Sequence, residues 1–302
     1  MPLDDCTDEP LPQLAPRSAD SHKGDYGRVL IVGGSRGMAG APAIAGMAAL
    51  RSGAGLVTVA TPIGVQATVA AFTPCYMTLP LVEDDYGIVD LANIVDLAAA
   101  RERFDVWAIG PGLGQSADVA ELVAQLYRDV PRAMVVDADG LNALASTLKR
   151  NPQLLNNPAG PRILTPHPGE FARLAGVKPA DAAKDRAEQA AEVCRRDASG
   201  KTVVVLKGHE TVVCDGARFA VNRTGNPGMA TGGTGDCLTG VIAALVGQKL
   251  DAWSAARLGV HVHGLAGDLA AAELGEVSLI ASDLIEYLPR ALLHSRGSTT
   301  RR

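Results

Sequence analysis

The stretch Arg28-Val-Leu-Ile-Val-Gly-Gly-Ser35 decides the fold, because an apolar, β-branched run ends there at two glycines. A helix is expected from about Ala39 to Arg51, and the next apolar run, Leu56 to Ala60, has the composition of a second strand. A strand, a helix and another strand in this order form a βαβ unit with parallel strands. The stretch therefore predicts an α/β fold built around a parallel sheet.

The same alternation continues along the chain and then changes its character. Further parallel strands are predicted over residues 105–109, 133–136, 162–164 and 202–206. Two short strands, Thr211 to Asp215 and Arg218 to Asn222, flank Asp215-Gly216 and predict a hairpin, which gives the sheet an antiparallel edge. The remainder is helical by its period, over residues 236–246, 252–274 and 279–293.

Length and composition indicate one globular domain rather than two. The chain has 302 residues, of which 47% are hydrophobic and 20% charged, and no low-complexity linker divides its body. Residues 1–20 are acidic and rich in proline, and residues 294–302 end in polar and basic side chains. We expect both ends to be flexible tails around a single domain that spans residues 21–293.

Charge and cysteine usage argue against several classes of protein. The net charge is −5 and the body has no dense Lys/Arg tract, so nucleic acid is not an expected partner. No apolar run approaches the ~18 residues of a membrane span, and the N-terminus lacks the features of a signal peptide. The five cysteines are scattered and odd in number, as expected in a reducing compartment. We predict a cytoplasmic protein that does not bind membranes.

The segment from Gly225 to Asp236 reads Gly-Asn-Pro-Gly-Met-Ala-Thr-Gly-Gly-Thr-Gly-Asp and leads directly into an apolar helix. Its glycines, Gly232, Gly233 and Gly235, let the backbone approach a ligand, and the free amides of a helix start favour phosphate. Asp236 beside them could take a proton from an attacking hydroxyl, or it could only cap the helix. No Gly-Lys-Ser/Thr follows, so this is not a Walker A loop.

A second candidate segment lies just past the strand at residues 202–206. Its residues are Lys207, Gly208, His209, Glu210 and Thr211. A lysine at a strand end can reach a phosphate as a point charge, although a surface lysine in a hairpin turn is an equal alternative.

Three loops with less specific signals follow other strands. Gly33 to Ala41 lacks the spacing of a dinucleotide fingerprint but permits close approach by a flat ligand, and Gly110 to Gly114 forms a plausible substrate wall. Asp137 and Asp139 stand at another strand end, where they could orient Mg²⁺ through water or cap the next helix. These two interpretations are equally supported.

The run Thr165-Pro-His-Pro-Gly-Glu-Phe171 holds a histidine between two prolines. Such rigid presentation of His167 indicates ligand contact, while a satisfied loop histidine and a first-turn Glu170 are the alternative. His261 and His263 are two residues apart in a helical stretch and face different directions, so we reject them as a metal pair. No other spacing of histidine or cysteine predicts metal ligands.

Together these segments resemble the ADP- or ATP-dependent NAD(P)H-hydrate dehydratases of the ribokinase-like superfamily. The resemblance covers about residues 22–288 and rests on an ordered set of motifs. They are His22-Lys-Gly-Asp-Tyr-Gly-Arg-Val-Leu-Ile-Val-Gly-Gly-Ser, Ala49-Leu-Arg-Ser-Gly-Ala-Gly-Leu-Val-Thr-Val, Gly110-Pro-Gly-Leu-Gly, Val136-Asp-Ala-Asp-Gly-Leu-Asn, Leu164-Thr-Pro-His-Pro-Gly-Glu-Phe, Lys207-Gly-His-Glu-Thr and Gly232-Gly-Thr-Gly-Asp. The implied fold is a three-layer α/β/α structure with a mostly parallel central sheet and an antiparallel edge.

The resemblance implies repair of hydrated NADH and NADPH (NADHX and NADPHX, in their S form). The C6 hydroxyl would be phosphorylated and eliminated, with Asp236 as the base and Gly235 among the amides that stabilise the phosphoryl group. Residues 207–211 would contact the nucleotide, and Ala41, Gly112 and His167 would line the substrate pocket together with Asp236.

The resemblance also implies the cofactors and partners. Mg²⁺ and ADP, or ATP in related forms, would be required, although no metal ligand can be named. Many relatives carry an N-terminal epimerase domain, which a tail of about 20 residues cannot hold. We therefore expect a separate epimerase to supply the S form, and a homotetramer as the assembly.

Two other functions compete with this interpretation. A small-molecule kinase of the same fold, acting on a vitamin precursor or a sugar, would keep the Gly-Thr-Gly-Asp segment but not the whole motif set. A catalytically silent nucleotide-binding module is less compatible with the presence of Asp236.

Overall fold

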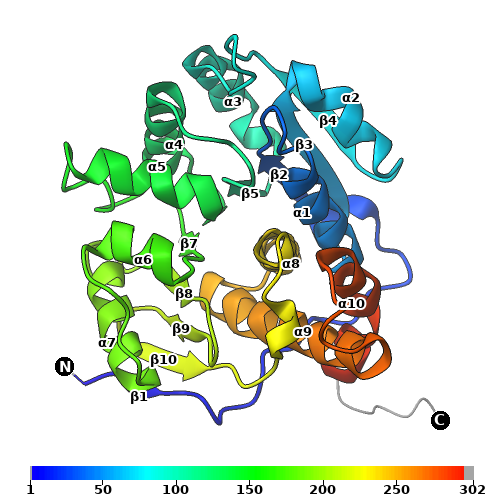
Figure 1. Ribbon diagram of the computed structural model, residues 1–302, viewed down its shortest axis with the longest axis vertical. Helices are drawn as coiled ribbons and strands as arrows, with labels where there is room; N and C mark the ends of the chain where they lie inside the picture. Colours follow the sequence, from blue (N-terminus) through cyan, green and yellow to red (C-terminus); the bar gives the residue numbers. More distant parts are fainter. Residues whose placement is uncertain (1, 296–302) are drawn as a thin grey trace.

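A computed structural model describes residues 2–295 and shows a ten-stranded sheet with helices on both faces (Figure 1). The strand order is β1-β10-β9-β8-β7-β6-β5-β2-β3-β4, and all neighbours are parallel except β9, which is antiparallel to β8 and β10. The strands are β1 (Asp4–Asp5), β2 (Arg28–Val32), β3 (Leu56–Pro62), β4 (Met77–Leu81), β5 (Val106–Ile109), β6 (Ala133–Val136), β7 (Arg162–Leu164), β8 (Thr202–Leu206), β9 (Val212–Cys214) and β10 (Arg218–Val221).

Ten α-helices are present among the described residues. They are α1 (Gly40–Arg51), α2 (Ile63–Ala71), α3 (Ile94–Ala100), α4 (Ala117–Asp129), α5 (Ala138–Leu148), α6 (Pro168–Ala175), α7 (Ala183–Cys194), α8 (Thr234–Gly247), α9 (Ala252–Leu274) and α10 (Ala281–Ser295). The predicted mostly parallel sheet and its antiparallel edge are confirmed, and so are the three long C-terminal helices, whose ends lie within two residues of the predicted ones.

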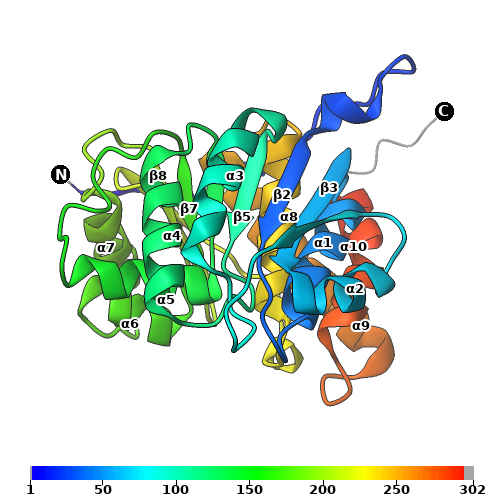
Figure 2. The same cartoon turned by 90° about the horizontal axis from the view of Figure 1, so that it is seen from above.

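The central strands are buried on both faces, which gives the molecule three layers. In β2, Val29 and Ile31 point into the core formed with α1, α8, α9 and α10. Leu30 and Val32, which alternate with them, point into the second core with α4, α5, α6 and α7. Figure 1 shows the two groups of helices on opposite sides of the strands, and Figure 2 shows the strands side by side. Burial of both faces explains why β2 is an uninterrupted apolar run.

The N-terminal residues are part of the fold, so the prediction of a flexible tail over residues 1–20 is wrong for their first part. Asp4–Asp5 forms β1 and pairs with β10, and the side chain of Cys6 is buried. Arg257 on α9 donates hydrogen bonds to the carbonyl oxygens of Cys6 and Glu9 at 2.9 and 3.0 Å. Strand pairing here uses backbone groups, so the polar side chains gave no sign of it. Of the other predicted tail, residues 294 and 295 belong to α10, and residues 296–302 lie outside the described part of the chain.

The order of the strands reverses at β2. From β2 the chain runs to β3 and β4 on one side, and then returns to form β5 on the other side of β2. In open α/β sheets, ligands bind outside the carboxyl ends of the strands at such a switch point. Two glycine loops meet there, because the hydroxyl of Ser35 after β2 donates to the carbonyl oxygen of Gly112 after β5 at 2.8 Å.

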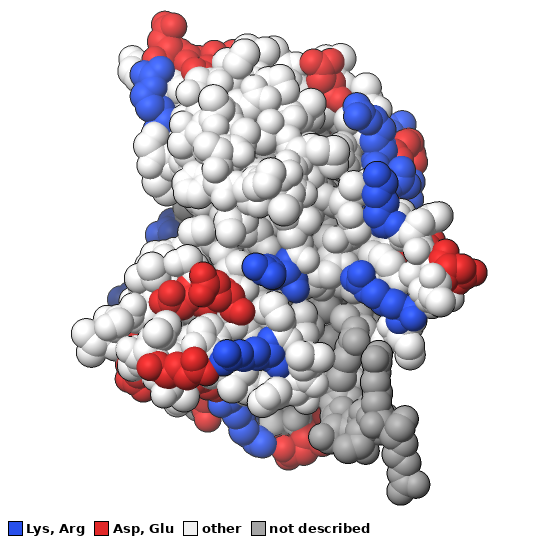
Figure 3. Space-filling model, turned by 90° about the vertical axis from the view of Figure 1, so that its right-hand side faces the viewer, with Lys and Arg blue, Asp and Glu red and all other residues white. Residues whose placement is uncertain are grey.

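Charged side chains are unevenly distributed over the surface. Residues 52–82, which include β3, α2 and β4, contain no Asp, Glu, Lys or Arg. Figure 3 shows the face with α2 and β4, where the upper half is largely uncharged and the lower half mixes acidic and basic side chains. Within residues 2–295, no helix is both long enough and apolar enough to cross a membrane.

Candidate active site

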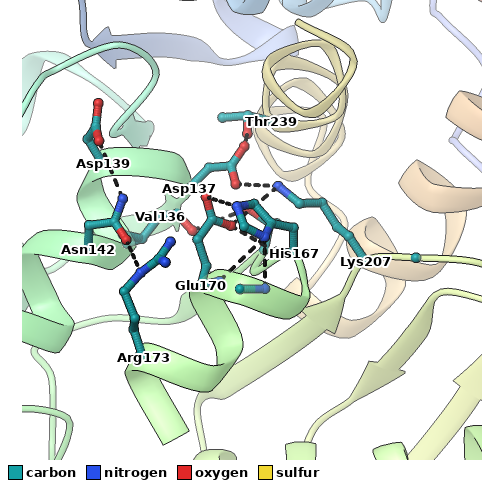
Figure 4. A network of polar contacts seen from close by, with 12 residues as sticks. Val136, Asp137, Asp139, Asn142, His167, Glu170, Arg173, Lys207 and Thr239 are labelled. Carbon is teal, nitrogen blue, oxygen red and sulfur yellow. Dashed lines mark hydrogen bonds and ion pairs between the residues drawn. The ribbon is translucent and has the colours of Figure 1, made fainter. Parts of the chain in front are cut away.

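Polar side chains from four elements meet at the carboxyl edge of the sheet (Figure 4). Lys207 follows β8, Asp137 follows β6, and Glu170 lies in the first turn of α6 after β7. The strands β6, β7 and β8 are neighbours in the sheet, so their ends bring these side chains together. The first two turns of α8 complete the group with Asp236 and Thr239. We call these five residues the Lys207 cluster.

Lys207 is turned into the protein rather than toward solvent. Its Nζ lies 2.6 Å from Oδ1 of Asp137 and 3.9 Å from Oε2 of Glu170, and its side chain is only 18% exposed. The alternative of a surface lysine in a hairpin turn is therefore wrong. A buried ammonium requires compensating negative charge, and the two carboxylates supply it.

Asp137 is held from two sides. Its Oδ1 accepts the hydrogen bond from Lys207, and its Oδ2 accepts one from the hydroxyl of Thr239 at 2.7 Å. Although Asp137 occupies the N-cap position of α5, its side chain makes no capping hydrogen bond. The capping alternative for Asp137 is therefore wrong. Thr239 was not among the predicted site residues, because a single threonine in an apolar helix has no distinctive sequence signal.

The start of α8 has the geometry of an anion site. Gly233 is the N-cap with φ of 92°, a left-handed conformation that glycine adopts without strain. A Cβ on Gly235 would lie 3.2 Å from Nζ of Lys207, so the ammonium stands directly beside the first turn. A Cβ on Gly232 would meet no atom within 4 Å, so the backbone there is open. Amides and an ammonium at one helix start are suited to phosphate.

Asp236 lies in this first turn, and no side chain caps α8. The alternative in which Asp236 serves only as a helix cap is therefore wrong. Burial and the negative charge of Asp137 together raise the pKa of Asp236 to about 7, against the opposing charge of Lys207. A carboxyl that titrates near neutral pH can exchange a proton with a bound ligand.

His167 and Glu170 form a reciprocal cap at the start of α6. Nδ1 of His167 accepts hydrogen bonds from the amides of Gly169 and Glu170 at 3.0 and 3.4 Å, and Oε2 of Glu170 accepts the His167 amide at 2.8 Å. The histidine side chain is half exposed and lies at the rim of the Lys207 cluster. Burial raises the pKa of Glu170 to about 6, against the opposing charge of Lys207. This cap fixes the histidine and agrees with the alternative of a satisfied histidine beside a first-turn Glu170, and contact of His167 with a ligand stays a prediction.

The loop Gly208–Thr211 leaves the cluster and runs along the surface. The Thr211 hydroxyl donates to the carbonyl oxygen of Gly208 at 3.0 Å, and Arg186 of α7 donates to the carbonyl oxygens of His209 and Glu210 at 2.9 and 3.1 Å. The side chains of His209 and Glu210 are exposed. Of the predicted nucleotide segment, only Lys207 thus belongs to the Lys207 cluster. The other four residues, Gly208 to Thr211, form an ordered loop beside it.

Ala41 and Gly112 lie against each other at the switch point. A Cβ on Gly112, where φ is 64°, would come within 3.1 Å of Cβ of Ala41. The neighbouring Gly114 amide donates to Oδ2 of Asp139 at 2.9 Å, which joins this loop to the start of α5. The structure therefore places the predicted substrate wall along the same sheet edge as the Lys207 cluster.

The Lys207 cluster contains more acidic than basic side chains. Asp137, Glu170 and Asp236 carry three negative charges when ionised against the single positive charge of Lys207, an excess of two. The described residues contain no group of three or more His, Cys, Asp or Glu arranged to hold a metal ion by themselves. Mg²⁺ keeps several of its waters and is usually held by one or two carboxylates with substrate phosphates.

Comparison with known proteins identifies the family of the chain. The sequence model that describes NAD(P)H-hydrate dehydratase matches residues 29–290. The bifunctional NAD(P)H-hydrate repair enzyme Nnr of Moorella thermoacetica is 47% identical over 282 residues, covering 93% of this chain and 52% of that protein. The chain spans about half the length of the curated relatives it matches.

Solved structures agree with this assignment. The ADP/ATP-dependent NAD(P)H-hydrate dehydratase of Bacillus subtilis, co-crystallised with ATP/Mg²⁺, has a TM-score of 0.76 at 33% identity and covers 94% of this chain and 95% of its own. A ribokinase-like superfamily protein from Enterococcus faecalis has a TM-score of 0.76 at 27% identity, with 93% and 92% covered. The predicted ribokinase-like fold is confirmed. With its sequence, its fold and its motif set in agreement, the chain belongs to the NAD(P)H-hydrate dehydratase family.

Proposed function

We propose that this chain dehydrates the S forms of NADHX and NADPHX at the expense of ADP or ATP, and so restores NADH and NADPH. The observation that carries the proposal is the arrangement at the start of α8. A carboxyl with a pKa near 7, an ammonium and a glycine-rich helix start lie within one cluster. A base beside a site for a phosphoryl group is the minimum that phosphorylation of an alcohol requires.

In the first step, Asp236 takes the proton of the C6 hydroxyl while the oxygen attacks the terminal phosphorus of the nucleotide. The bond between that phosphorus and the bridging oxygen breaks, and the shortened nucleotide leaves with the electron pair. Gly235 and the neighbouring amides face the charge that develops on the phosphoryl oxygens. The ammonium of Lys207, fixed by Asp137 at 2.6 Å, adds a positive charge to the same place.

In the second step, the C6–O bond breaks and phosphate leaves with the bonding electrons. The lone pair of the ring nitrogen assists this departure, and transfer of the C5 proton to water restores the double bond of the dihydronicotinamide. Phosphate is a far better leaving group than hydroxide, which is the physical reason for consuming a nucleotide. We assign Ala41, Gly112 and His167 to the pocket that holds the ring, because they lie along the same sheet edge.

The nucleotide is proposed to lie along Lys207–Thr211 and the glycines Gly232, Gly233 and Gly235. Support comes from the open backbone at Gly232 and from the ordered loop that Arg186 and Thr211 hold. Mg²⁺ would neutralise charge on the transferring phosphoryl group, and we assign no residue of this chain as its ligand. ADP is the expected donor and ATP the alternative.

Two proposals concern partners. The curated relatives are bifunctional repair enzymes about twice as long as the matched region, so we propose that an epimerase activity supplies the S form to this chain. We also propose a homotetramer located in the cytoplasm. Light scattering coupled to size exclusion would test the assembly, because a monomeric mass of about 31 kDa would contradict it.

The decisive experiment offers hydrated NADH to the protein with Mg²⁺ and either ADP or ATP. Recovery of the reduced-nicotinamide absorbance reports the reaction. Asp236→Asn should abolish the recovery, because the amide cannot accept the proton. Asp96→Asn, on the exposed face of α3, is the matched control and should retain the wild-type rate.

Three outcomes would count against the proposal. Equal rates for wild type and Asp236→Asn would remove the assigned base. A stable phosphorylated product with no recovery of absorbance would favour a small-molecule kinase. Nucleotide binding without turnover of either kind would favour a silent module.

A further inference from the structure

We propose that Thr239 and Asp137 are positioning residues that hold the Lys207 ammonium between Asp236 and the glycine-rich start of α8. The inference rests on the proposed function and goes further, because it assigns roles to two residues that act through Lys207. Three side chains from α8, the end of β6 and the end of β8 form one hydrogen-bonded chain (Figure 4).

This series of hydrogen bonds begins on α8, the same helix that carries the proposed base. Asp236 and Thr239 are three residues apart, so they lie on the same side of the helix, one turn above the other. Thr239 is fully buried, and its neighbours from Cys237 to Leu245 are otherwise apolar or glycine. A buried hydroxyl is unfavourable without a partner, and here it donates to Oδ2 of Asp137 at 2.7 Å.

Asp137 connects Thr239 to Lys207, because it accepts a hydrogen bond from each of them. Its carboxylate is 1% exposed, and each of its two oxygens has one partner, Thr239 on one side and Lys207 on the other. The carboxylate cannot rotate without losing one of these bonds inside the protein. Thr239 therefore fixes the direction in which Asp137 receives the ammonium, at 2.6 Å.

The position of the ammonium matters because it serves two neighbours. A Cβ on Gly235 would lie 3.2 Å from Nζ of Lys207, so the ammonium stands at the proposed phosphoryl site. Lys207 also opposes the rise in the pKa of Asp236. If the ammonium moved away, the phosphoryl site would lose a positive charge and Asp236 would hold its proton more tightly.

The other charged groups near Asp236 all belong to fixed elements. They are Asp137 and Asp139 of the β6–α5 region, Glu170 of α6 and Lys207 itself. His263 of α9 also lies near Lys207, and its Nε2 is hydrogen-bonded to the carbonyl oxygen of Thr234 at 2.9 Å. Of these groups, only Lys207 favours the ionised form of Asp236. Among these charged groups, the ammonium of Lys207 is thus the one that keeps Asp236 able to accept a proton.

The test compares two substitutions of one side chain. Thr239→Val keeps the shape and removes the donor, whereas Thr239→Ser keeps the donor. We expect the valine variant to lose about 10²-fold in kcat, with KM for the nucleotide nearly unchanged, because a misplacement of ~1 Å can cost that much. The serine variant should stay within about threefold of wild type, by the same reasoning. Equal losses in both variants would show a packing role and overturn the inference.

A double-mutant cycle separates positioning from general damage. In a Lys207→Ala background the ammonium is absent, so Thr239→Val should cause little further loss of kcat. Fully multiplicative effects of the two substitutions would contradict the proposed coupling. Should Thr239→Val not fold, Asp137→Asn replaces it in the cycle with the same expected coupling.

An independent readout keeps this inference separate from the proposed function. The titration of Asp236 is followed by ¹³C NMR of labelled aspartate in the protein without ligands, with Asp236→Asn for assignment. Thr239→Val should raise the midpoint of Asp236 and Thr239→Ser should not. This result would support the positioning role even if hydrated NADH were not a substrate. An unchanged midpoint in the valine variant, together with an unchanged kcat, would overturn it.

Discussion

Replacing Asp236 by asparagine should make the protein more stable at alkaline pH while it abolishes activity. The carboxyl is surrounded by Asp137, Asp139 and Glu170, and it is largely removed from water, so its ionised form is disfavoured in the folded state. Asparagine has nearly the same shape and no charge. The substitution therefore removes an unfavourable interaction that the proposed chemistry requires.

The magnitude follows from the pKa of Asp236, which rises from 3.8 to about 7 on folding. Between these values the unfolded chain has released the proton and the folded protein retains it, so the stability of the wild type falls as pH rises. One pKa unit corresponds to about 1.4 kcal/mol. The asparagine variant should therefore gain about 2 kcal/mol over wild type at pH 5 and about 4 kcal/mol at pH 8, as upper values.

Urea unfolding of both proteins at pH 5 and pH 8, without nucleotide, measures this difference. Asp96→Asn serves again as the control, because Asp96 is an exposed carboxylate on α3. The reasoning would be refuted if Asp236→Asn changed the free energy of unfolding equally at the two pH values. A wild type that gains stability over the variant as pH rises would refute it too.

Three other substitutions test separate parts of the structure. Gly235→Ala would bring a methyl group to 3.2 Å from Nζ of Lys207, and we expect kcat to fall about 10²-fold or more with unchanged circular dichroism. Gly240→Ala should destabilise the protein by about 2 kcal/mol or more in urea unfolding, because the added carbon overlaps the carbonyl oxygen of Ala45 in the contact between α8 and α1. Arg162→Met should cost about 3 kcal/mol or more by the same measurement, because its fully buried guanidinium donates to four backbone carbonyls, each of which would lose this donor.

The sequence was most informative where periodicity and glycines marked the same place. The run Arg28–Val32 predicted the first parallel strand, and Asp215-Gly216 predicted the hairpin between β9 and β10. The strand β4 was not predicted, because its sequence Met77–Leu81 contains a proline and shows no alternation. The strand β1 was missed because two aspartates read as part of a charged tail, while their backbone pairs with β10.

The site shows a similar division. Asp236 and Lys207 stood out separately, one by its glycine-rich setting and the other by its place after a strand, and the fold brings them together. The sequence left the role of Asp137 open between a metal and a cap, because the partner that decides it is 70 residues away in Lys207 and 102 residues away in Thr239. Hydrogen bonds over such separations have no local pattern, so only the tertiary structure shows them.

The two outermost strands of the sheet bear on how copies of the protein can aggregate. An exposed edge strand offers free amides and carbonyls to other chains and is a usual starting point for intermolecular β-sheet. Here one edge is β1, only two residues long and made of two aspartates, so charge repulsion opposes pairing with a second copy. The other edge is β4, where Pro80 has no amide hydrogen to donate. We therefore expect the folded protein to resist fibril-type growth through its sheet, although the sheet is ten strands wide.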